Sequence, residues 1–559
     1  MARNPISPAL LSRWLGQEHL PTEQQADVIG DQPGPLLVVA GAGAGKTETM
    51  AARVVWLVAN GFATPDQILG LTFTKKAAQQ LSQRIRARLA TLAGIPRLAD
   101  LDPTGELQTN LQAITPTVST YDSYAGRIVG EYGLLLPVEP SSRMITTAEL
   151  YQIAWDVVGN YTGNVDATVT HGTVTDRLIS LVGEMDGHMV SAADIEAETE
   201  PFVRLFDELP KGPRQRDKLN AAMLKIRDTQ LARLDYLPLV RQLKEEMAER
   251  GVITFGEQMS LAATVAQRHP VVGRSQRQRF RVVMLDEYQD TSHAQRVLLS
   301  SLFGVPRQEG MPDAAPDVTV TAVGDPMQAI YGWRGASSNA LADFARSFAG
   351  AQPVERLALS TSFRSDVAIL DAANAVAAPL DNPVVEVREL QPRPGCGPGR
   401  VVEARPLLAE DSYRAIARRI EDVRARTSQA EIAVLCRRRS SIEKVADALG
   451  HRGISYEIVG GESLIERPEI LTVRAALGIL AHPSRGGLLV RLLLHWGIGS
   501  DAIRILYEWS RSLASRAVGK TPLDPRAEAN LVEALDDLPD AGWSGPSGLA
   551  LTPAVVDRL

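Results

Sequence analysis

One segment near the start of the chain constrains its fold more than any other: a small-residue loop that ends in lysine and threonine. The apolar run at residues 36–39 is typical of a buried β-strand, and the loop follows it directly as Ala40, Gly41, Ala42, Gly43, Ala44, Gly45, Lys46 and Thr47. Small residues let consecutive backbone N–H groups turn toward one anion, and the N-terminus of a helix expected at residues 46–60 adds a positive partial charge. Lys46 would reach the β- and γ-phosphates, and Thr47 would bind Mg²⁺. The sequence therefore predicts a strand, a phosphate-binding loop and a helix, in that order.

A second apolar run, at residues 282–285, ends in two adjacent carboxylates, Asp286 and Glu287. Hydrolysis of a nucleoside triphosphate needs a carboxylate in the Mg²⁺ shell and a base for the attacking water. We expect Asp286 to serve the metal and Glu287 to accept the proton. A strand followed by a solvent-exposed acidic turn would give the same pair, and it is the phosphate loop upstream that favours the catalytic interpretation.

The order of apolar runs predicts an α/β fold. Short β-rich runs alternate with helical stretches, which is typical of βαβ units and a parallel sheet. Strands are expected at residues 36–39, 68–73, 281–285, 318–323 and 356–360, and a further helix at residues 75–92. Long amphipathic stretches at residues 134–253 indicate a helical insertion that interrupts this sheet. A second α/β stretch follows, with helices from about residue 366 and at 440–450 and strands at 432–436 and 454–459.

Length and composition exclude several classes of protein. At about 150 residues per domain, 559 residues correspond to about three or four domains. A chain that is 45% hydrophobic and 22% charged is ordinary for a globular protein, and no apolar run reaches the roughly 18 residues of a membrane-spanning helix. Cys396 and Cys436 lie far apart, so neither a disulfide framework nor a zinc site is supported. Prolines interrupt the N-terminal segment, which lacks the apolar centre of a secretion signal, and we expect a cytoplasmic protein.

Charge gives a weaker indication. The net charge is −7, so any nucleic-acid site must be local rather than spread over the whole protein. The most concentrated basic stretch lies at residues 268–281 and contains five arginines and no acidic residue. A solvated loop and a DNA-facing surface both remain open for it.

The acid pair belongs to a longer motif, Asp286-Glu287-Tyr288-Gln289-Asp290-Thr291, that resembles motif II of the UvrD/Rep/PcrA helicases of superfamily 1. Other segments resemble further motifs of this family in the same order: residues 22–29 the Q motif, 71–78 motif Ia, 119–124 motif Ib, 323–336 motif III and 359–365 motif IV. The match covers about residues 20–480. It implies two RecA-like P-loop lobes with parallel sheets, each carrying a helical insertion.

The resemblance implies roles for individual residues. Lys46, Glu287, Gln328 and Arg364 would be catalytic, with Gln328 contacting the γ-phosphate and Arg364 acting as an arginine finger. The loop residues, Gln25, Glu48 and Phe363 would bind ATP, Phe363 by stacking on adenine; Gln24 is the alternative to Gln25. The residues expected to contact single-stranded DNA are Thr72, Phe73, Thr74, Tyr121, Tyr331, Trp333 and Arg334. Packing in the protein interior is the alternative for each of the aromatic residues.

The resemblance also divides the chain. Residues 1–133 and 254–352 would form the first lobe, 134–253 its helical insertion, 353–478 the first part of the second lobe, and 479–559 the start of a second insertion. No segment resembles motif V or motif VI, so we expect a second lobe that is incomplete. Departures from the usual family residues, such as Glu48 and Lys75, favour a RecB-like or mycobacterial AdnB-like branch.

The resulting hypothesis is an ATP-dependent DNA helicase or translocase that uses Mg²⁺ and moves 3′ to 5′ along single-stranded DNA. It would act at single-strand/double-strand junctions in repair or recombination, with a second helicase or a nuclease subunit as a candidate partner and no membrane. The alternative is an incomplete, non-processive subunit that binds ATP and DNA and acts with a partner chain. A P-loop enzyme unrelated to nucleic acid would explain the loop, but not residues 71–78, 323–336 and 359–365.

Overall fold

The computed structural model consists of two units, Met1–Val402 and Glu403–Leu559. The described residues are 6–96, 105, 108–109, 111, 115–136, 142–163, 169–211, 219–305, 318–332, 335–336, 339–349, 354–380, 385–459, 468–481, 483, 486–518, 530–540 and 543–556.

A six-stranded parallel sheet is the centre of the first unit, and it confirms the predicted α/β fold. Its strand order is β3-β2-β6-β7-β1-β8. The strands are β1 (Leu36–Ala40), β2 (Ile68–Thr72), β3 (Thr117–Thr120), β6 (Val282–Leu285), β7 (Thr319–Gly324) and β8 (Glu355–Leu359). Every residue of β1, β2, β6 and β7 is buried, as expected for parallel strands covered on both faces.

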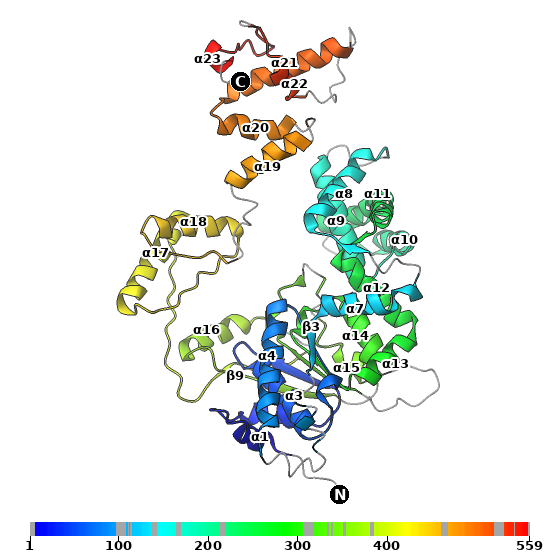
Figure 1. The fold of residues 1–559 in the computed structure, drawn as a ribbon, viewed down its shortest axis with the longest axis vertical. Helices are drawn as coiled ribbons and strands as arrows, with labels where there is room; N and C mark the ends of the chain where they lie inside the picture. Colours follow the sequence, from blue (N-terminus) through cyan, green and yellow to red (C-terminus); the bar gives the residue numbers. More distant parts are fainter. Residues whose placement is uncertain are drawn as a thin grey trace. The chain divides into compact units, whose positions relative to one another are not determined.

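Helices cover both faces of this sheet, because alternate strand residues point to opposite sides. Leu36 and Val38 face α1 (Pro8–Trp14), α2 (Glu23–Gly30), α3 (Lys46–Ala59) and α4 (Lys75–Ala93). Leu37 and Val39 belong to the core on the other face, with α7 (Tyr121–Tyr132), α12 (Phe255–Arg268), α13 (Pro270–Arg279), α14 (His293–Phe303) and α15 (Phe344–Phe348) (Figure 1). The sheet is therefore the middle layer of three.

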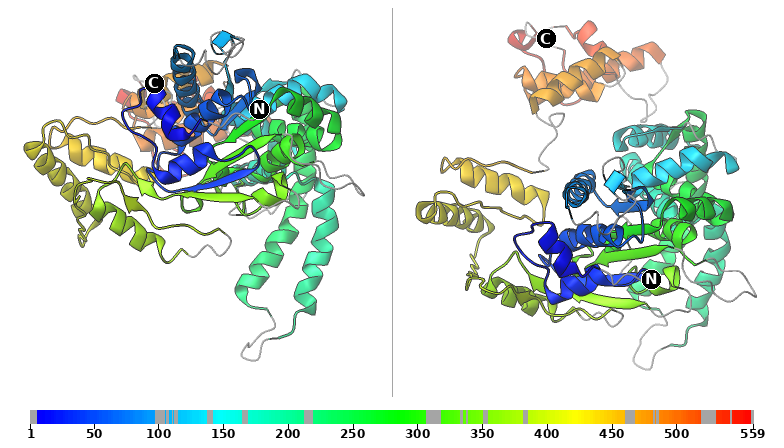
Figure 2. Two further views of the ribbon diagram at one scale, coloured as in Figure 1. Left: turned by 90° about the horizontal axis from the view of Figure 1, so that it is seen from below. Right: turned by 60° about the horizontal axis from the view of Figure 1, so that its bottom comes forward.

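The predicted helical insertion is present. It consists of α8 (Thr147–Asn160), α9 (His171–His188), α10 (Ala192–Glu208) and α11 (Ala221–Glu249), which share a core of their own. Two short parallel strands, β4 (Arg143–Met144) and β5 (Val252–Ile253), pair where the chain enters and leaves it. Figure 2 shows α10 and α11 as two long helices side by side that project from the sheet domain.

The first sheet extends beyond residue 352, the predicted end of the first lobe. β8 pairs in parallel with β1, in the register Val38↔Leu357 and Ala40↔Leu359. The Gly41 N–H donates to the Leu359 carbonyl at 2.9 Å, which continues the pairing to the phosphate loop. The first unit then continues through β9 (Thr361–Ser362), α16 (Val367–Ala377) and β10 (Gln391–Pro392).

The second unit contains helices, and the strands that the sequence predicted do not form among its described residues. Its elements are α17 (Ala409–Arg426), α18 (Arg439–Gly450), α19 (Pro468–Ala481), α20 (Gly486–His495), α21 (Ser500–Val518), α22 (Glu533–Asp536) and α23 (Pro553–Val556). The predicted strands at 432–436 and 454–459 are wrong: neither segment is in a strand, and Leu435 is 95% exposed. An apolar run forms a parallel strand only where neighbouring strands bond to it and helices cover it, and the described part of this unit supplies no such sheet.

Candidate nucleotide site and nucleic-acid groove

The phosphate loop has the backbone geometry that its small residues predict. Gly43 and Gly45 have φ values of 76° and 79°, in the left-handed region that favours glycine, and α3 begins directly afterwards at Lys46. A Cβ on Gly43 would lie 2.7 Å from both Arg364 Cβ and Ser362 Oγ. The Gly43 carbonyl accepts a hydrogen bond from the Phe363 N–H at 2.8 Å. The segment of residues 362–364 therefore lies directly against the loop.

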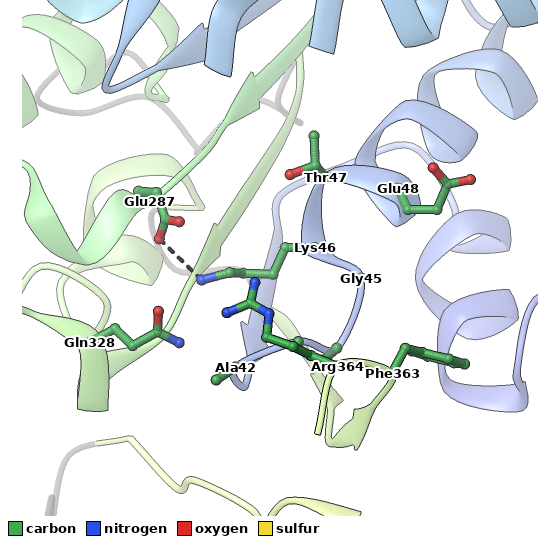
Figure 3. A pocket seen from close by; sticks show the side chains of 11 residues that line it. Ala42, Gly45, Lys46, Thr47, Glu48, Glu287, Gln328, Phe363 and Arg364 are labelled. Carbon is green, nitrogen blue, oxygen red and sulfur yellow. Dashed lines mark hydrogen bonds and ion pairs between the residues drawn. The ribbon is translucent and has the colours of Figure 1, made fainter. Parts of the chain in front are cut away.

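All four predicted catalytic side chains line one cavity of about 370 Å³ beside this loop. The lining consists of residues 42–48 together with Glu287, Gln328, Phe363 and Arg364. Figure 3 shows Lys46, Glu287 and Gln328 toward one end of the cavity and Phe363 at the other, with Arg364 between them. A triphosphate at the charged end and a base at the aromatic end fit this arrangement.

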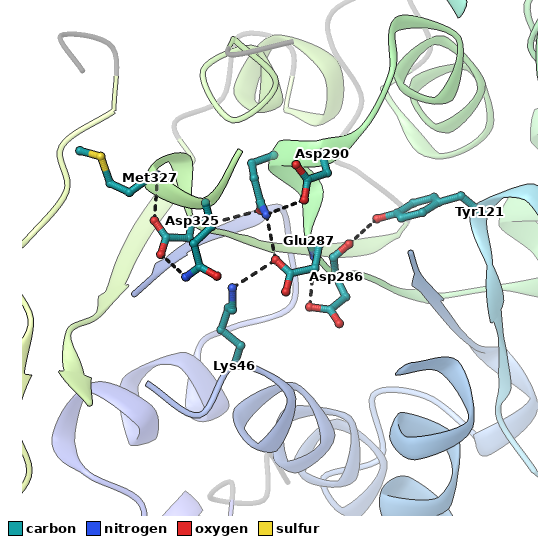
Figure 4. Close-up of polar contacts among 9 residues, drawn as sticks. Lys46, Tyr121, Asp286, Glu287, Asp290, Asp325 and Met327 are labelled. Atoms are coloured by element: carbon teal, nitrogen blue, oxygen red, sulfur yellow. Dashed lines mark hydrogen bonds and ion pairs between the residues drawn. The ribbon is translucent and has the colours of Figure 1, made fainter. Parts of the chain in front are cut away.

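Lys46 and Glu287 form an ion pair across the cavity, 3.1 Å from Nζ to Oε2. Glu287 follows β6 with a φ of 49°, which is uncommon for a residue with a side chain and costs about 1 kcal/mol or more. This turn directs its carboxylate into the cavity, whereas Asp286 stays behind it (Figure 4).

Asp286 is buried at the end of β6. Burial and the adjacent Glu287 carboxylate raise its pKa to about 6, and Lys46 acts in the opposite direction. Its Oδ1 accepts a hydrogen bond from the Glu287 N–H at 3.1 Å. A buried carboxylate with so little compensating charge fits a divalent cation, and Thr47 in the cavity wall offers a second oxygen of the kind that Mg²⁺ prefers.

The two glutamines of the Q-motif segment both reach this site. Gln25 caps α2 by accepting from the Thr22 N–H, and its Nε2 donates to the Ala44 carbonyl of the loop at 3.4 Å. Gln24 binds Ser360 twice at 2.9 Å, just before Phe363. The roles of Gln25 and Gln24 toward adenine stay predictions.

Glu48 lines the nucleotide cavity, but its carboxylate is bound to side chains of a neighbouring helix. Its carboxylate forms ion pairs with Arg84 and Arg88 of α4. These contacts join the first turn of α3 to α4, so in this arrangement the side chain supports the loop from behind.

A second cavity, of about 560 Å³, also takes part of its wall from the motif II segment. Its wall includes Phe73, Tyr121, Phe255, Asp290 and Gly335. Phe73 and Tyr331 lie with ring centroids 4.8 Å apart and planes 32° from parallel. We call this cavity with the Phe73–Tyr331 pair the aromatic groove.

Two of the residues predicted to contact DNA are buried in this structure, and their roles toward DNA stay predictions. Tyr121 is only 3% exposed, and its hydroxyl donates to the Asp286 carbonyl at 2.9 Å. Thr72 is 0% exposed, and its hydroxyl donates to the Thr74 carbonyl. Both residues end or follow core strands, so packing occupies them. Thr74 is exposed at the start of α4 and accepts from the Ala77 N–H, whereas Trp333 and Arg334 lie outside the described residues.

Sequence reasoning missed two residues. Phe255 begins α12, is 58% exposed and lines the aromatic groove, but no local pattern distinguishes it from other apolar residues. Gln289 donates to Glu287 Oε2 at 2.8 Å. Its place inside the motif II segment was the available signal.

The basic stretch at residues 268–281 is mostly α13, a helix rather than a loop. Arg277 donates to the Leu302 carbonyl and Arg279 pairs with Glu131, so part of this charge is used within the protein. Among the described residues, no helix is both long and apolar enough to cross a membrane.

Two family models match the chain. The UvrD/REP helicase N-terminal domain matches residues 21–349, and the UvrD-like helicase C-terminal domain matches residues 357–516. The chain is 29% identical over 534 residues to the ATP-dependent DNA helicase UvrD1 of Mycobacterium tuberculosis, covering 92% of this chain and 61% of that protein.

Two further relatives agree. The chain is 26% identical over 510 residues to the ATP-dependent DNA helicase PcrA of Leuconostoc citreum (90% of this chain, 59% of the relative) and 28% identical over 466 residues to the ATP-dependent DNA helicase UvrD2 of M. tuberculosis (81% and 57%). It thus spans about three fifths of the length of the curated relatives it matches. The placement near a RecB-like or AdnB-like branch stays a prediction.

Proposed function

Because the chain belongs to the UvrD/REP helicase family, we propose that it is an ATP-driven motor on single-stranded DNA. One observation carries this proposal: the nucleotide cavity and the aromatic groove both take wall residues from the same short segment, residues 286–290. Glu287 faces the first cavity, and Asp290 lines the second. A conformational change at one cavity can therefore be transmitted to the other through this short segment.

ATP binding would rearrange the Lys46–Glu287 ion pair. A γ-phosphate in the cavity competes for Lys46, because its charge is larger and the loop N–H groups already favour an anion there. Glu287 would then be free to accept a proton from the water that attacks the γ-phosphate. Arg364 lines the same cavity and would stabilise the charge that develops on the transferred phosphoryl group. Mg²⁺, held by Thr47 and Asp286, would neutralise phosphate charge when bound.

DNA binding would use stacking rather than base reading. Phe73, Tyr331 and Phe255 offer aromatic faces, which accept any base and so suit a motor that must pass over every sequence. Thr74, exposed beside Phe73, is placed for a backbone phosphate. We extend the same role to Trp333 and Arg334 on the family resemblance alone.

The finer parts of the proposal also follow the family resemblance. The motor would move 3′ to 5′, act at single-strand/double-strand junctions in repair or recombination, and work in the cytoplasm, where a reducing environment suits two free cysteines. A partner helicase or nuclease subunit would complete its activity if the chain acts as the alternative, non-processive subunit.

Strand separation tests this proposal. Duplexes with a 3′ or a 5′ single-stranded tail are mixed with protein, Mg²⁺ and ATP, and release of the labelled strand is followed by fluorescence. We expect release from the 3′-tailed duplex only, and none with Glu287→Gln. Release from the 5′-tailed duplex alone would contradict the polarity. ATP and DNA binding without hydrolysis would instead favour the partner-subunit alternative.

A further inference from the structure

A buried glutamine, Gln289, lies between the nucleotide cavity and the aromatic groove. It is 3% exposed and packs on the end of β7, where a Cβ on Gly324 would come within 2.6 Å of its Oε1. Its Nε2 donates to Glu287 Oε2 at 2.8 Å and to Asp290 Oδ2 at 3.1 Å, and its Oε1 accepts from the Asp325 N–H at 3.0 Å. One side-chain amide therefore connects three acidic residues.

On one side these bonds lead to the nucleotide cavity. Glu287 Oε2 accepts hydrogen bonds from both Gln289 and Lys46. If Lys46 leaves Glu287 for another partner, the bond between Glu287 and Gln289 changes with it. Asp325 Oδ2 accepts from Gln328 Nε2 at 2.5 Å, and Gln328 lines the same cavity (Figure 3). Gln289 is thus joined to two cavity residues, Glu287 directly and Gln328 through Asp325.

On the other side the bonds lead to the aromatic groove. Burial raises the pKa of Asp290, while the main-chain N–H groups of Ile330 and Tyr331, which face its carboxylate, act in the opposite direction. Tyr331 then packs on Phe73. Ser292, which directly follows motif II, forms an antiparallel bridge with Ala336, five residues after Tyr331. A movement of Asp290 would therefore displace Tyr331 and so change the aromatic groove.

The Asp290 carboxylate has capacity to change partners. Its Oδ1 is buried and makes no hydrogen bond within the described part of the chain, whereas Oδ2 is bound to Gln289. A buried acceptor without a bond is costly, and a small approach of a neighbouring N–H would satisfy it. Oδ1 can therefore accept a further hydrogen bond while Oδ2 keeps its bond to Gln289.

We propose that Gln289 is a positioning residue that couples nucleotide binding to the grip on single-stranded DNA, by holding Glu287 and Asp290 as one unit. The proposal rests on the proposed function and deepens it. When a phosphate takes Lys46 from Glu287, Gln289 follows the carboxylate and shifts Asp290, which carries Tyr331 toward or away from Phe73. The contacts form a continuous route from Lys46 through Gln289 and Asp290 to Tyr331, and energetic coupling between sites is carried by such connected networks.

Gln289→Ala tests the coupling, with Gln276→Ala as the matched control. Gln276 is equally buried and is also hydrogen-bonded through its amide, to Tyr124 and Tyr132, but it lies in α13 and lines neither cavity. The readouts are the ratio of kcat with and without oligothymidylate, and the Kd of the oligothymidylate with and without a non-hydrolysable ATP analogue. We expect Gln289→Ala to reduce both ratios by about tenfold, and Gln276→Ala to leave them unchanged.

Asp290→Asn is the second variant, because it keeps the size of the side chain and alters only the groove side of the network. It should reduce the same two ratios as Gln289→Ala. Ratios that match those of Gln276→Ala would overturn the proposal, as would equal loss of basal and stimulated rates, which marks a structural role. A wild-type ATPase rate that does not change when DNA is added would count against the motor function. The ratio of the oligothymidylate Kd values with and without the ATP analogue then tests the role of Gln289 separately. A ratio of one for the wild-type protein would overturn the coupling as well.

Discussion

Replacing Gly43 with alanine tests how closely residues 362–364 pack on the phosphate loop. The new Cβ would occupy a left-handed conformation, which costs about 1 to 2 kcal/mol. It would also lie 2.7 Å from Ser362 Oγ and 2.7 Å from Arg364 Cβ, and the latter atom is fixed by the backbone and cannot swing away. Overpacking of this kind costs about 1 to 3 kcal/mol more. The free energy of unfolding of the first unit should therefore fall by about 2 to 5 kcal/mol.

Gly61→Ala is the matched control. Gly61 has the same φ of 76° as Gly43, but a Cβ there would meet no atom within 4 Å. It should lose only the conformational part, about 1 to 2 kcal/mol, and retain the wild-type affinity for ATP. The difference between the two variants isolates the contact with residues 362–364.

Urea-induced unfolding measures the stability of both variants, and equilibrium dialysis with ATP and Mg²⁺ measures binding. For Gly43→Ala we expect the additional loss of about 1 to 3 kcal/mol and an ATP affinity at least about tenfold weaker, because either the loop or Arg364 must move. Equal stability and equal ATP affinity in Gly43→Ala and Gly61→Ala would refute the packing of residues 362–364 on the loop.

Three further variants probe the site and its support. Asp286→Asn, without Mg²⁺ or nucleotide, should stabilise the protein at pH 8 by up to about 3 kcal/mol, because the folded carboxyl, with a pKa of about 6 against its ordinary 3.8, resists ionisation. Denaturation measured at several pH values should show that this gain in stability disappears below about pH 4, and a gain that is constant with pH would contradict the explanation. Arg53→Met removes the buried guanidinium that donates to α2 carbonyls and Thr321, and thermal unfolding should show a loss of about 2 to 4 kcal/mol that the exposed Arg84→Met does not share. Phe73→Leu should weaken single-stranded DNA binding about fivefold or more in fluorescence anisotropy while ATP affinity without DNA stays the same; a matching loss of ATP affinity would count against a DNA-specific role.

The parts of the fold that the sequence predicted are those with local causes. The loop from Ala40 to Thr47 needs small residues at positive φ, and this requirement is written in the residues themselves. The buried strands of the first sheet are continuous apolar runs, and α3 and α4 follow them with helical periodicity. The grouping of Lys46, Glu287, Gln328 and Arg364 around one cavity followed from the order of the motifs.

Other features depend on contacts between distant segments, which periodicity cannot supply. The sequence suggests a stacking role for Tyr121, but in the structure its hydroxyl donates to the Asp286 carbonyl. Phe255 lines the groove because the chain returns there after the helical insertion. β8 joins the first sheet because β1 offers it a free edge. The apolar run at 432–436 has the pattern of a strand, but no neighbouring strand pairs with it in the described residues.

The most direct test of the central claim is the rate of phosphate release from ATP by the wild-type chain, measured with and without saturating oligothymidylate. The account predicts stimulation of at least about tenfold, since the motif II segment joins the two cavities. Lys46→Ala and Arg364→Ala, which remove cavity charges, should abolish it. An equal rate with and without DNA, or a stimulated rate that survives Lys46→Ala, would contradict the claim.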